Sequence, residues 1–394
     1  MAELFSDLVR APGEAQGRWA SDAWRIGVDV AAVYADDVDV NARFPHETIA
    51  ALKESRFLSA MLPAELGGGD ASLADMVAAV RALGAHCVSS ALVLAMHCIE
   101  IVNLNRHGDS PGLRELSREV AQSELLIANA NSEVGIGGDV GRSRCFVDTT
   151  ATPWTLHKEA LAISYGENAD LLVATARNSP DAAETEQFLC VLRAADVRLK
   201  PISEWDTLGL RGTCSRGYEL DAVVDPTIVF PVPFSVTAND GGGQSGQLLR
   251  SAAWVGIAES AASRAHAFVR AAARRDVGTT PPGALRVSEI AAELHQLRAL
   301  LAMSMSRYEE FESTSELQHP GLITLLRNLK VASSQGAAHI ATAALEVCGI
   351  AGLQRRSPFS LDRLIRDAHG GLVMVSNDRY LRDNSQLLLA RKSL

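Results

Sequence analysis

A glycine-rich segment near the middle of the chain has the composition of a ligand-binding loop. It reads NSEVGIGGDVGRS, spans Asn131–Ser143 and leaves the strand-like run LLIANANS. Glycines such as Gly137 and Gly138 let backbone N–H groups approach an anionic or aromatic ligand closely. A tight surface turn needs the same residues, so the segment alone leaves both interpretations open.

One titratable carboxylate lies in a short polar segment near the C-terminus. Asp378 lies in SNDRYLRDN, and a positioned carboxylate can remove a proton from a reacting carbon. The same residue can cap a helix N-terminus or pair with Arg382 on the surface. By contrast, His97 lies on an apolar helical face, where we expect a hydrogen-bonded core residue rather than a catalytic one.

The elements that position these residues fall into successive units. From Ser21 to Leu126, apolar residues recur at three- and four-residue spacing, which predicts helices, including apolar ones at Leu73–Gly84 and Ser89–Asn105. Between about residues 125 and 235, short runs rich in β-branched residues predict strands. These runs are LLIANANS, ALAISYG, DLLVATAR, FLCVLRA and YELDAVV.

The C-terminal part is predicted to be a helical bundle. Periodic segments cover Leu248–Arg275, Gly283–Glu312 and Gly321–Gly349, with a fourth near Leu361–Val375, and short loops favour antiparallel neighbours. The preceding segment, Val236–Gln247, is glycine-rich and is predicted to be a linker. The sequence thus predicts an α+β protein with a helical domain (1–124), a β-barrel or β-sandwich domain (125–240) and a four-helix bundle (241–394).

Composition limits the partners. The 394 residues carry 37 basic and 47 acidic side chains, a net charge of −10, which gives no electrostatic reason to bind nucleic acid or an anionic membrane. Six scattered cysteines without a CxxC pair favour free thiols over a disulfide framework or a zinc site. The acidic N-terminus lacks an apolar core and no apolar run has membrane-spanning length, so we expect a cytoplasmic protein.

Five segments together resemble the acyl-CoA dehydrogenase superfamily over nearly the whole chain. They are similar to the family patterns TEPGAGSD, KxWITNG, GxRxSxT, RxxFG and QxFGGxG, the last of which precedes an ERxxRDA helix. The resemblance implies bound FAD that lies between the subunits of a homodimer or homotetramer. The matching segments are Ser132–Asp139, Ala160–Gly166, Leu208–Ser215, Ala273–Gly278 and Ala343–Gly352, followed by Arg363–Arg379.

The resemblance also implies site residues. Ser132 and Ser164 take the places of threonines that contact the flavin, with Ser132 retaining a hydrogen-bond donor, whereas Ala162 replaces a stacking aromatic residue. Arg274 takes the place of an arginine that reaches the FAD diphosphate of a neighbouring subunit, and Glu346 that of a glutamine. The implied cofactor contacts are Asn129, Asn131, Ser132, Gly137, Gly138, Ile163, Ser164, Arg274, Glu346, Gly349 and Gly352, and the implied substrate contacts are Met96, Arg211, Gln247 and Met374.

The glutamate that serves as the base in much of the family has no counterpart at the expected positions. Counting on from Arg366 and Asp367 without a gap puts Val375 in its place. A second location that the family uses falls on Gly246, beside Gln247, and neither residue can act as a base.

The C-terminal segment is longer than in typical members of the family, so the ungapped count is one of two alignments. An insertion placed earlier moves Ser376, Asn377 or Asp378 into the position of the glutamate. Asp378 is then the local carboxylate candidate, and its alternative role is the helix cap or surface pair described above.

The resemblance leads to three hypotheses. The first is α,β-dehydrogenation of an acyl thioester of CoA or a carrier protein, with a displaced base and an electron-transfer partner. The second is a two-component monooxygenase that uses O2 and reduced flavin, FMN or FAD, from a reductase. Such enzymes often carry a histidine after the RD motif, and His369 lies closer to that motif than expected. The third is a flavin-binding protein without catalytic activity.

Overall fold

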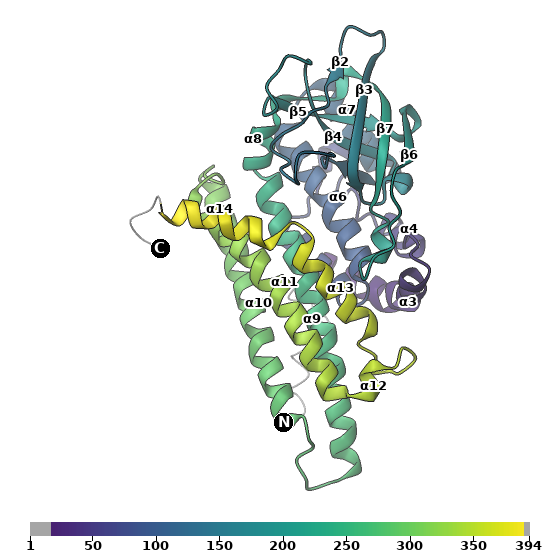
Figure 1. The fold of residues 1–394 in the computed structure, drawn as a ribbon, viewed down its shortest axis with the longest axis vertical. Helices are drawn as coiled ribbons and strands as arrows, with labels where there is room; N and C mark the ends of the chain where they lie inside the picture. The colour runs from purple at the N-terminus through teal and green to yellow at the C-terminus, as the bar shows by residue number, and fades with distance from the viewer. Residues whose placement is uncertain (1–16, 390–394) are drawn as a thin grey trace.

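The computed structural model describes residues 17–389, which form N-terminal helices, a β domain and a C-terminal helical bundle (Figure 1). This order confirms the predicted fold class. The acidic N-terminal segment lies outside the described residues. The N-terminal helices are α2 (Gly17–Ile26), α3 (Ala32–Val40), α4 (His46–Glu54), α5 (Leu73–Gly84), α6 (Val88–His107) and α7 (Pro111–Ser123), with a π-helical turn at Gly27–Ala31.

Local capping explains where α5 begins. The Ser72 hydroxyl accepts a hydrogen bond from the Asp75 backbone N–H at 3.1 Å, and the Asp75 carboxylate accepts one from the Ser72 N–H at 3.0 Å. This reciprocal pair satisfies two N–H groups that a helix N-terminus otherwise leaves free. The helix therefore starts at Leu73, as the periodicity predicts.

Helix α6 is a core helix. It is long and apolar enough to cross a membrane by length and composition, but 83% of the apolar window is buried inside the protein. His97 on this helix is fully buried, with Nε2 2.7 Å from the Leu58 carbonyl and Nδ1 accepting from the Ile127 N–H at 3.1 Å. Burial lowers the pKa of His97 to about 4, so it is the neutral, hydrogen-bonded core residue that the sequence predicts.

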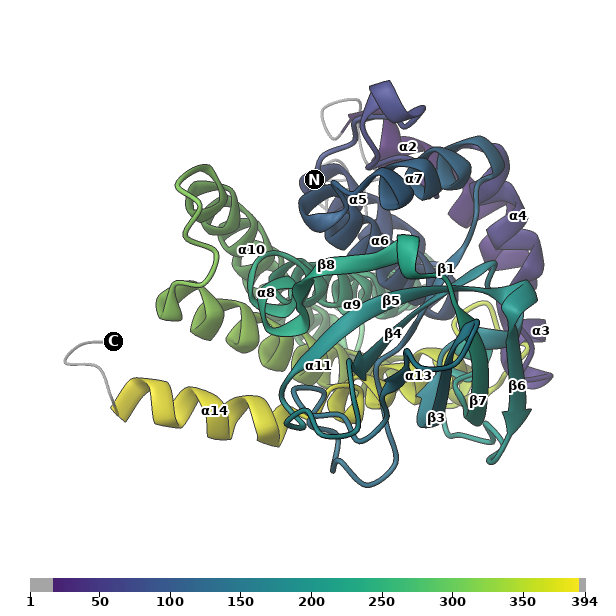
Figure 2. The ribbon, with the colours of Figure 1, turned by 90° about the horizontal axis from the view of Figure 1, so that it is seen from above.

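The β domain consists of two four-stranded sheets (Figure 2), with strand orders β1-β4-β5-β8 and β2-β3-β7-β6. Strand β1 pairs with β4 in parallel, and the other pairs are antiparallel. The five predicted runs form strands, whereas the short β2, the largely exposed β6 and the proline-containing β8 lack the apolar alternation needed to predict them. The strands are β1 (Ile127–Ala130), β2 (Val147–Asp148), β3 (Trp154–Ile163), β4 (Leu171–Arg177), β5 (Gln187–Arg193), β6 (Val197–Pro201), β7 (Arg216–Val224) and β8 (Val229–Pro233).

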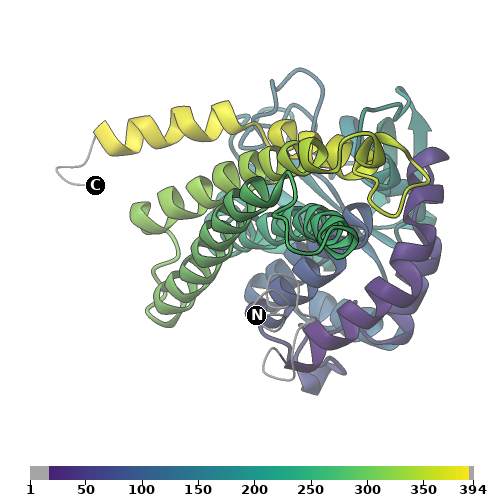
Figure 3. The ribbon, with the colours of Figure 1, turned by 90° about the horizontal axis from the view of Figure 1, so that it is seen from below.

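The C-terminal helices pack as a bundle of α9, α10, α11 and α13, and α14 leads away from it (Figure 3). The long segments end within a few residues of their predicted bounds. The described cysteines are all free, as predicted. The helices are α8 (Phe234–Asn239), α9 (Gly242–Arg275), α10 (Ala284–Ser313), α11 (Pro320–Cys348), α12 (Ile350–Leu353), α13 (Asp362–Val373) and α14 (Asn377–Leu389).

The predicted linker at Val236–Gln247 is wrong, because most of this segment belongs to α8 and to the first turns of α9. Glycine disfavours a helix, but here neighbouring side chains need its small size. A Cβ on Gly242 would lie 2.3 Å from Asn103 Oδ1, and one on Gly246 would lie 2.8 Å from Arg250 Nη2. Tertiary packing therefore overrides the local preference.

Helix α9 joins the N-terminal helices to the C-terminal bundle. It packs against α5, α6, α10 and α11, and its middle is almost wholly buried. Close approach to α5 depends on glycine: a Cβ on Gly84 would lie 2.9 Å from the Ala253 carbonyl oxygen, and one on Gly256 would lie 2.5 Å from the Arg81 carbonyl oxygen. The N-terminal helices and the bundle are thus held together along one seam.

Candidate functional site

Ser132 and the end of β3 bring two of the predicted flavin-contacting segments together. The Ser132 hydroxyl donates to the Ala162 carbonyl at 2.6 Å and accepts from the Ala162 N–H at 2.9 Å. Regular pairing of β3 with β7 is interrupted between Ala160 and Ile163, which frees these backbone groups for the serine. The only hydrogen of the hydroxyl is used inside the protein, so Ser132 offers a ligand a lone pair and not the expected donor.

The two predicted asparagines differ in what they offer a ligand. Asn129 is engaged on both sides, because its Oδ1 accepts from the Asn131 N–H at 3.1 Å and its Nδ2 donates to Glu100 at 2.6 Å. Asn131 Oδ1 is buried and has no hydrogen-bond partner among the described residues. A buried acceptor without a donor is costly, so this atom fits a bound group that carries an N–H or O–H.

The glycine-rich loop has the backbone conformation that its sequence suggests. Gly137 and Gly138 have φ angles of 62° and 77°, in the left-handed region that favours glycine. Glu133, buried at the start of the loop, accepts from the Ser143 hydroxyl at 2.8 Å and from the Arg144 N–H at 2.7 Å. Sequence reasoning did not single out Glu133, although a carboxylate beside a glycine-rich turn is a usable signal.

Ser164 belongs to a row of three hydroxyl groups. Its Oγ lies 2.7 Å from Ser215 Oγ, which lies 2.8 Å from Thr213 Oγ1, and Thr213 donates to the Leu210 carbonyl at 2.8 Å. Ser164 is half-buried, whereas Thr213 and Ser215 are buried. The predicted loop Leu208–Ser215 therefore lies directly behind the predicted flavin-contacting serine.

The RD motif supports this loop from α13. The Asp367 carboxylate accepts from the Leu210 N–H at 2.7 Å, and a Cβ on Gly209 would lie 2.1 Å from the Arg366 carbonyl oxygen. Burial raises the pKa of Asp367 to about 6, while the charge of Arg363 opposes the shift. Asp367 thus positions the loop, and Gly209 is required for the close approach.

Two arginines of the family-like motifs, Arg211 and Arg366, contact the N-terminal helix α3. Arg366 pairs with Asp39 and, at 3.0 Å, with Asp362. Arg211, an implied substrate contact, donates through Nε to the Asp39 carbonyl at 2.8 Å and through Nη1 to Asp206 at 2.9 Å. The guanidinium of Arg211 is therefore largely engaged with the protein.

The window predicted to hold the base is occupied by a buried lysine and an amide. Lys330, on α11, donates to the Val375 carbonyl at 2.6 Å, to Asn377 Oδ1 at 2.6 Å and to the Gly371 carbonyl at 3.1 Å. Val375 itself has a φ of 54°, which is unusual for a β-branched residue. Burial, together with the charges of Arg250 and Arg379, lowers the pKa of Lys330 to about 7.

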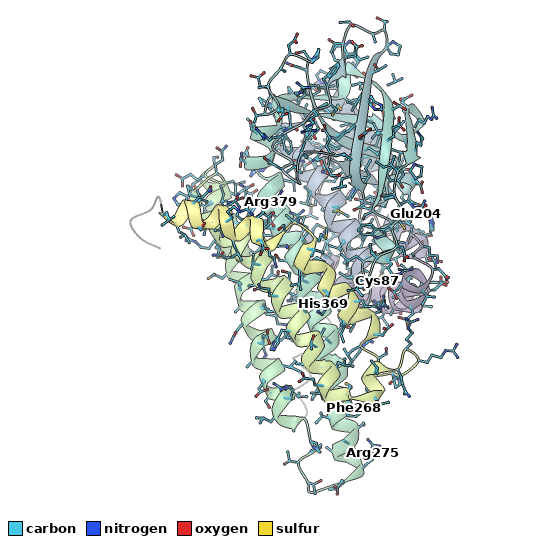
Figure 4. All side chains as sticks on the ribbon, in the orientation of Figure 1. Cys87, Glu204, Phe268, Arg275, His369 and Arg379 are labelled. Atoms are coloured by element: carbon cyan, nitrogen blue, oxygen red, sulfur yellow. The ribbon has the colours of Figure 1, made fainter. Side chains whose placement is uncertain are left out.

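Asp378 follows Asn377 directly, in the first turn of α14, and is exposed. Its neighbours Arg379 and Tyr380 line a cavity between the β domain and the bundle, whereas Asp378 is not among the lining residues. Figure 4 shows Arg379 at this junction. The side chain of Asp378 thus does not contribute to the wall of this cavity.

The cavity has a volume of about 590 Å³ and is lined by the glycine-rich loop and by α8, α9, α11 and α14. Its charged groups are the guanidiniums of Arg327, Arg379 and Arg382 and the carboxylates of Asp139 and Asp383. Asp383 lies 3.5 Å from Arg327, which leaves the remaining wall predominantly cationic. An anionic ligand would be favoured there.

Gln247 is the implied substrate contact that the structure places on the cavity wall. It is buried, its Nε2 donates to the Tyr380 hydroxyl at 2.6 Å, and its Oε1 has no partner among the described residues. Met96 and Met374 are half-buried against the core and do not line this cavity. His369, on α13, is half-buried with Nδ1 2.8 Å from the Ile365 carbonyl oxygen.

The remaining implied cofactor contacts lie at the other end of the bundle. Arg274, Glu346 and Gly349 are exposed at the C-terminal ends of α9 and α11, and Gly352 is buried in α12. In Figure 4, Arg275 marks this end, far from Arg379. Within one chain, the structure does not bring this group together with Ser132 and Ser164.

Comparison with known proteins agrees with this architecture. Residues 23–124 match the family model of the acyl-CoA dehydrogenase N-terminal domain, and residues 248–375 match that of the C-terminal domain, so the two cover more than half of the chain. The chain is 24% identical over 367 residues to the putative acyl-CoA dehydrogenase YdbM of Bacillus subtilis, covering 91% of this chain and 92% of YdbM.

Two further similar proteins have names that indicate other activities or ligands. The amino sugar nitrososynthase RubN8 of Streptomyces rubradiris is 28% identical over 352 residues, covering 85% of this chain and 81% of RubN8. The crystal structure of FMN-bound TdsC from Paenibacillus sp. A11-2 superposes with a TM-score of 0.82 at 18% identity, covering 96% of this chain and 98% of TdsC. From the matched domains and the shared fold, the chain belongs to the acyl-CoA dehydrogenase superfamily of flavin-dependent oxidoreductases.

Proposed function

We propose that this protein is a two-component flavin-dependent monooxygenase. The observation that carries the proposal concerns residues Val375–Asp378, the window in which the sequence predicts a base. Lys330 of α11 donates to Asn377 in this window, and the window's one carboxylate, Asp378, is exposed. Dehydrogenation of an acyl thioester needs a carboxylate to take the α-proton, and its loss costs about two to four orders of magnitude in rate. A monooxygenase needs no such group on the protein.

The residues of the β domain support flavin binding. The buried Asn131 Oδ1 and the half-buried Ser164 offer polar groups to a ligand, and Ser132 offers lone pairs in place of the donor that the resemblance implies. Reduced flavin, as FMN or FAD, would supply the electrons that activate O2. FMN is bound by the structurally similar TdsC, and a flavin reductase is the partner that this chemistry requires.

The cavity supports a small anionic substrate. Arg379 and Arg382 are favourably placed for a carboxylate or a phosphate, since guanidinium groups match both. Gln247 Oε1 and the Tyr380 hydroxyl would orient the organic part of the molecule. The relative RubN8 is named for action on an amino sugar, which is one substrate class to test.

The exposed group at the far end of the bundle supports a shared site in a homodimer or homotetramer. Arg274 carries the positive charge that a diphosphate needs. Glu346 would repel it, but Arg286 lies 3.4 Å from Glu346 and offsets its charge. We place the assembly in the cytoplasm, as expected from the sequence.

Acyl-thioester dehydrogenation is the second candidate, because Glu100 is a buried carboxyl group beside β1, the strand that leads to Asn131 and Ser132. Glu100, on α6, is buried and bonded to Asn129 at 2.6 Å and to Asn103 at 3.0 Å, and burial raises its pKa. A raised pKa brings a carboxylate closer to that of an effective base at neutral pH. Asp378 remains the alternative base, and an electron-transfer partner would be needed.

The two candidates are separated by mixing experiments on the full chain. We expect that acyl-CoA thioesters of short to long chain length do not bleach protein-bound oxidised FAD under anaerobic conditions. We expect instead that reduced FMN and heavy-isotope O2 yield labelled product from a panel of nucleotide-linked amino sugars and anionic aromatic heterocycles, read by mass spectrometry. Bleaching by a thioester would overturn the monooxygenase proposal, and failure to bind any flavin would overturn both candidates.

A further inference from the structure

The hydroxyl row behind Ser164 has one complete hydrogen-bonding arrangement. It contains three contacts, Ser164 to Ser215, Ser215 to Thr213 and Thr213 to the Leu210 carbonyl, at 2.7, 2.8 and 2.8 Å. Three hydroxyl hydrogens are available, one from each side chain. A contact without a hydrogen would leave two oxygens facing each other at hydrogen-bond distance, which is unfavourable.

The carbonyl end sets the direction of the row. A backbone carbonyl can only accept, so the hydrogen of Thr213 points to Leu210. Thr213 then accepts from Ser215, and Ser215 accepts from Ser164. No hydrogen remains on Ser164 for a ligand, and this serine presents only lone pairs to the flavin site.

The surrounding backbone holds this row in place under strain. Tyr165, Leu210 and Cys214 have φ angles of 45°, 57° and 46°, although none is glycine. Such residues persist where the surrounding structure determines them, and they gather at ligand sites. The Tyr165 N–H donates to the Thr213 carbonyl at 2.8 Å, and Asp367 accepts from the Leu210 N–H, so both ends are anchored.

Acceptors thus dominate the side chains assigned to the flavin ring. The Ser132 hydroxyl donates its hydrogen to the Ala162 carbonyl, and the Asn131 Oδ1 atom can only accept a hydrogen bond. Oxidised flavin has one ring N–H, at N3, whereas N5 of the ring gains a hydrogen on reduction. An acceptor next to N5 therefore binds the reduced ring and faces a lone pair of the oxidised ring.

We propose that Ser215 and Thr213 are positioning residues that fix Ser164 as a hydrogen-bond acceptor, so that the site selects reduced flavin over oxidised flavin. The inference rests on the proposed function, because it takes N5 of the flavin to lie against the Oγ of Ser164. It assigns to the Leu208–Ser215 loop a role in redox selectivity in place of substrate contact.

The test is the ratio of the dissociation constants of oxidised and reduced FMN, measured by anaerobic fluorescence titration of the full chain. We expect the wild-type protein to bind reduced FMN at least about tenfold more tightly, which corresponds to a potential of bound FMN about 30 mV above that of free FMN. In Ser215→Ala, Ser164 regains a free hydrogen and can donate to oxidised N5. The ratio should fall by about tenfold, the size of one hydrogen bond.

Thr213→Val and Ser117→Ala complete the design. Thr213→Val keeps the side-chain volume and leaves the Ser164–Ser215 pair without a fixed direction, so the ratio should fall by a smaller factor. Ser117 is a buried serine on α7 that donates to the Leu113 carbonyl at 2.9 Å. Its replacement should alter thermal stability but leave the ratio unchanged, which controls for general effects of losing a buried hydroxyl.

Two results would overturn the inference. One is a ratio that stays the same in Ser215→Ala and Thr213→Val while both variants still bind FMN; this would leave the flavin assignment intact. The other is the absence of FMN and FAD binding in either redox state by the wild-type protein, which would overturn the proposed function as well.

Discussion

Two oppositely charged groups are buried beside α13, one in the middle of the helix and one on α11 that reaches its C-terminal end. At the N-terminal half, the carboxylate of Asp367 accepts from the N–H of Leu210, a residue with a positive φ. Just beyond the C-terminal end, the ammonium of Lys330 donates to the carbonyl of Val375, which also has a positive φ. Each buried charged group holds a residue with a positive φ, but Asp367 belongs to the RD motif, whereas Lys330 contacts the window in which the sequence predicts a base. The comparison shows that hydrogen bonds from a buried side chain on another segment hold the backbone at both places.

The largest expected effects are on the pH dependence of stability, and they arise from Asp367 at acidic pH and from Lys330 at alkaline pH. The pKa of Asp367 rises from 3.8 to about 6 on folding, so the folded state binds more protons in that interval and stability is lost as pH rises from about 4 to 6, by at most about 3 kcal/mol. Asp367→Asn keeps an acceptor for Leu210 and should remove this fall. Urea unfolding at several pH values measures it, and an unchanged slope would show that Asp367 titrates normally.

The same experiment sharpens the contrast at the other end of α13. The pKa of Lys330 falls from 10.5 to about 7 on folding, so the unfolded state binds more protons between those values and stability increases as pH rises from about 7 to 10. We expect Lys330→Met to remove the increase in stability between about pH 7 and 10 and to leave the decrease between about pH 4 and 6 unchanged. If one variant changed the pH dependence of stability equally in both ranges, the two buried groups would not act separately and the comparison would fail.

At neutral pH, Lys330→Met should lower the free energy of unfolding by about 2 kcal/mol, because three buried acceptors lose their donor. Lys200→Met is the matched control, since this lysine makes an exposed pair with Glu219 at 2.6 Å; such pairs contribute little. Chemical denaturation of both variants measures the difference. Equal stability of the two would mean that the Lys330 contacts do not hold the turn at Val375.

The smallest effect is expected for Asp378→Asn. Because Asp378 is exposed and does not line the cavity, flavin affinity and turnover should change by less than about twofold, compared with the two to four orders of magnitude expected for a lost base. Steady-state kinetics with saturating reduced FMN measures this. A large loss in kcat with unchanged stability would restore Asp378 as the base.

Much of the fold could be predicted because periodicity reports burial directly. The bounds of α5 follow from its apolar spacing and capping box, and α9, α10 and α11 from their length and loop residues. The first turns of α9 could not be predicted from local preferences, because their glycines are explained by contacts with Asn103 and Arg250. Those contacts join segments whose proximity only the fold reveals.

For the site, the motifs located Ser132, Ser164 and the glycine-rich loop. They did not predict whether the two serine hydroxyls donate a hydrogen bond to a ligand or accept one. The direction of a hydrogen bond depends on partners such as Ala162 and Leu210, which no spacing rule supplies. Lys330 carried a usable signal that was missed: it is a lysine four residues after Leu326 on the apolar face of a predicted helix. A charged residue on such a face needs buried partners.

Helix α9 has a mechanical consequence. It carries Gln247 at the cavity and Arg274 at the opposite end of the bundle, which at 1.5 Å per residue places them about 40 Å apart along one rod. Gly256, at the close approach to α5, lies 18 residues or about 27 Å from Arg274, so a tilt of about 2° about this point would displace the Arg274 end by about 1 Å. The small-residue seam with α5 lies between these two positions, so the cavity wall at Gln247 and the exposed end at Arg274 belong to one continuous, tightly packed helix.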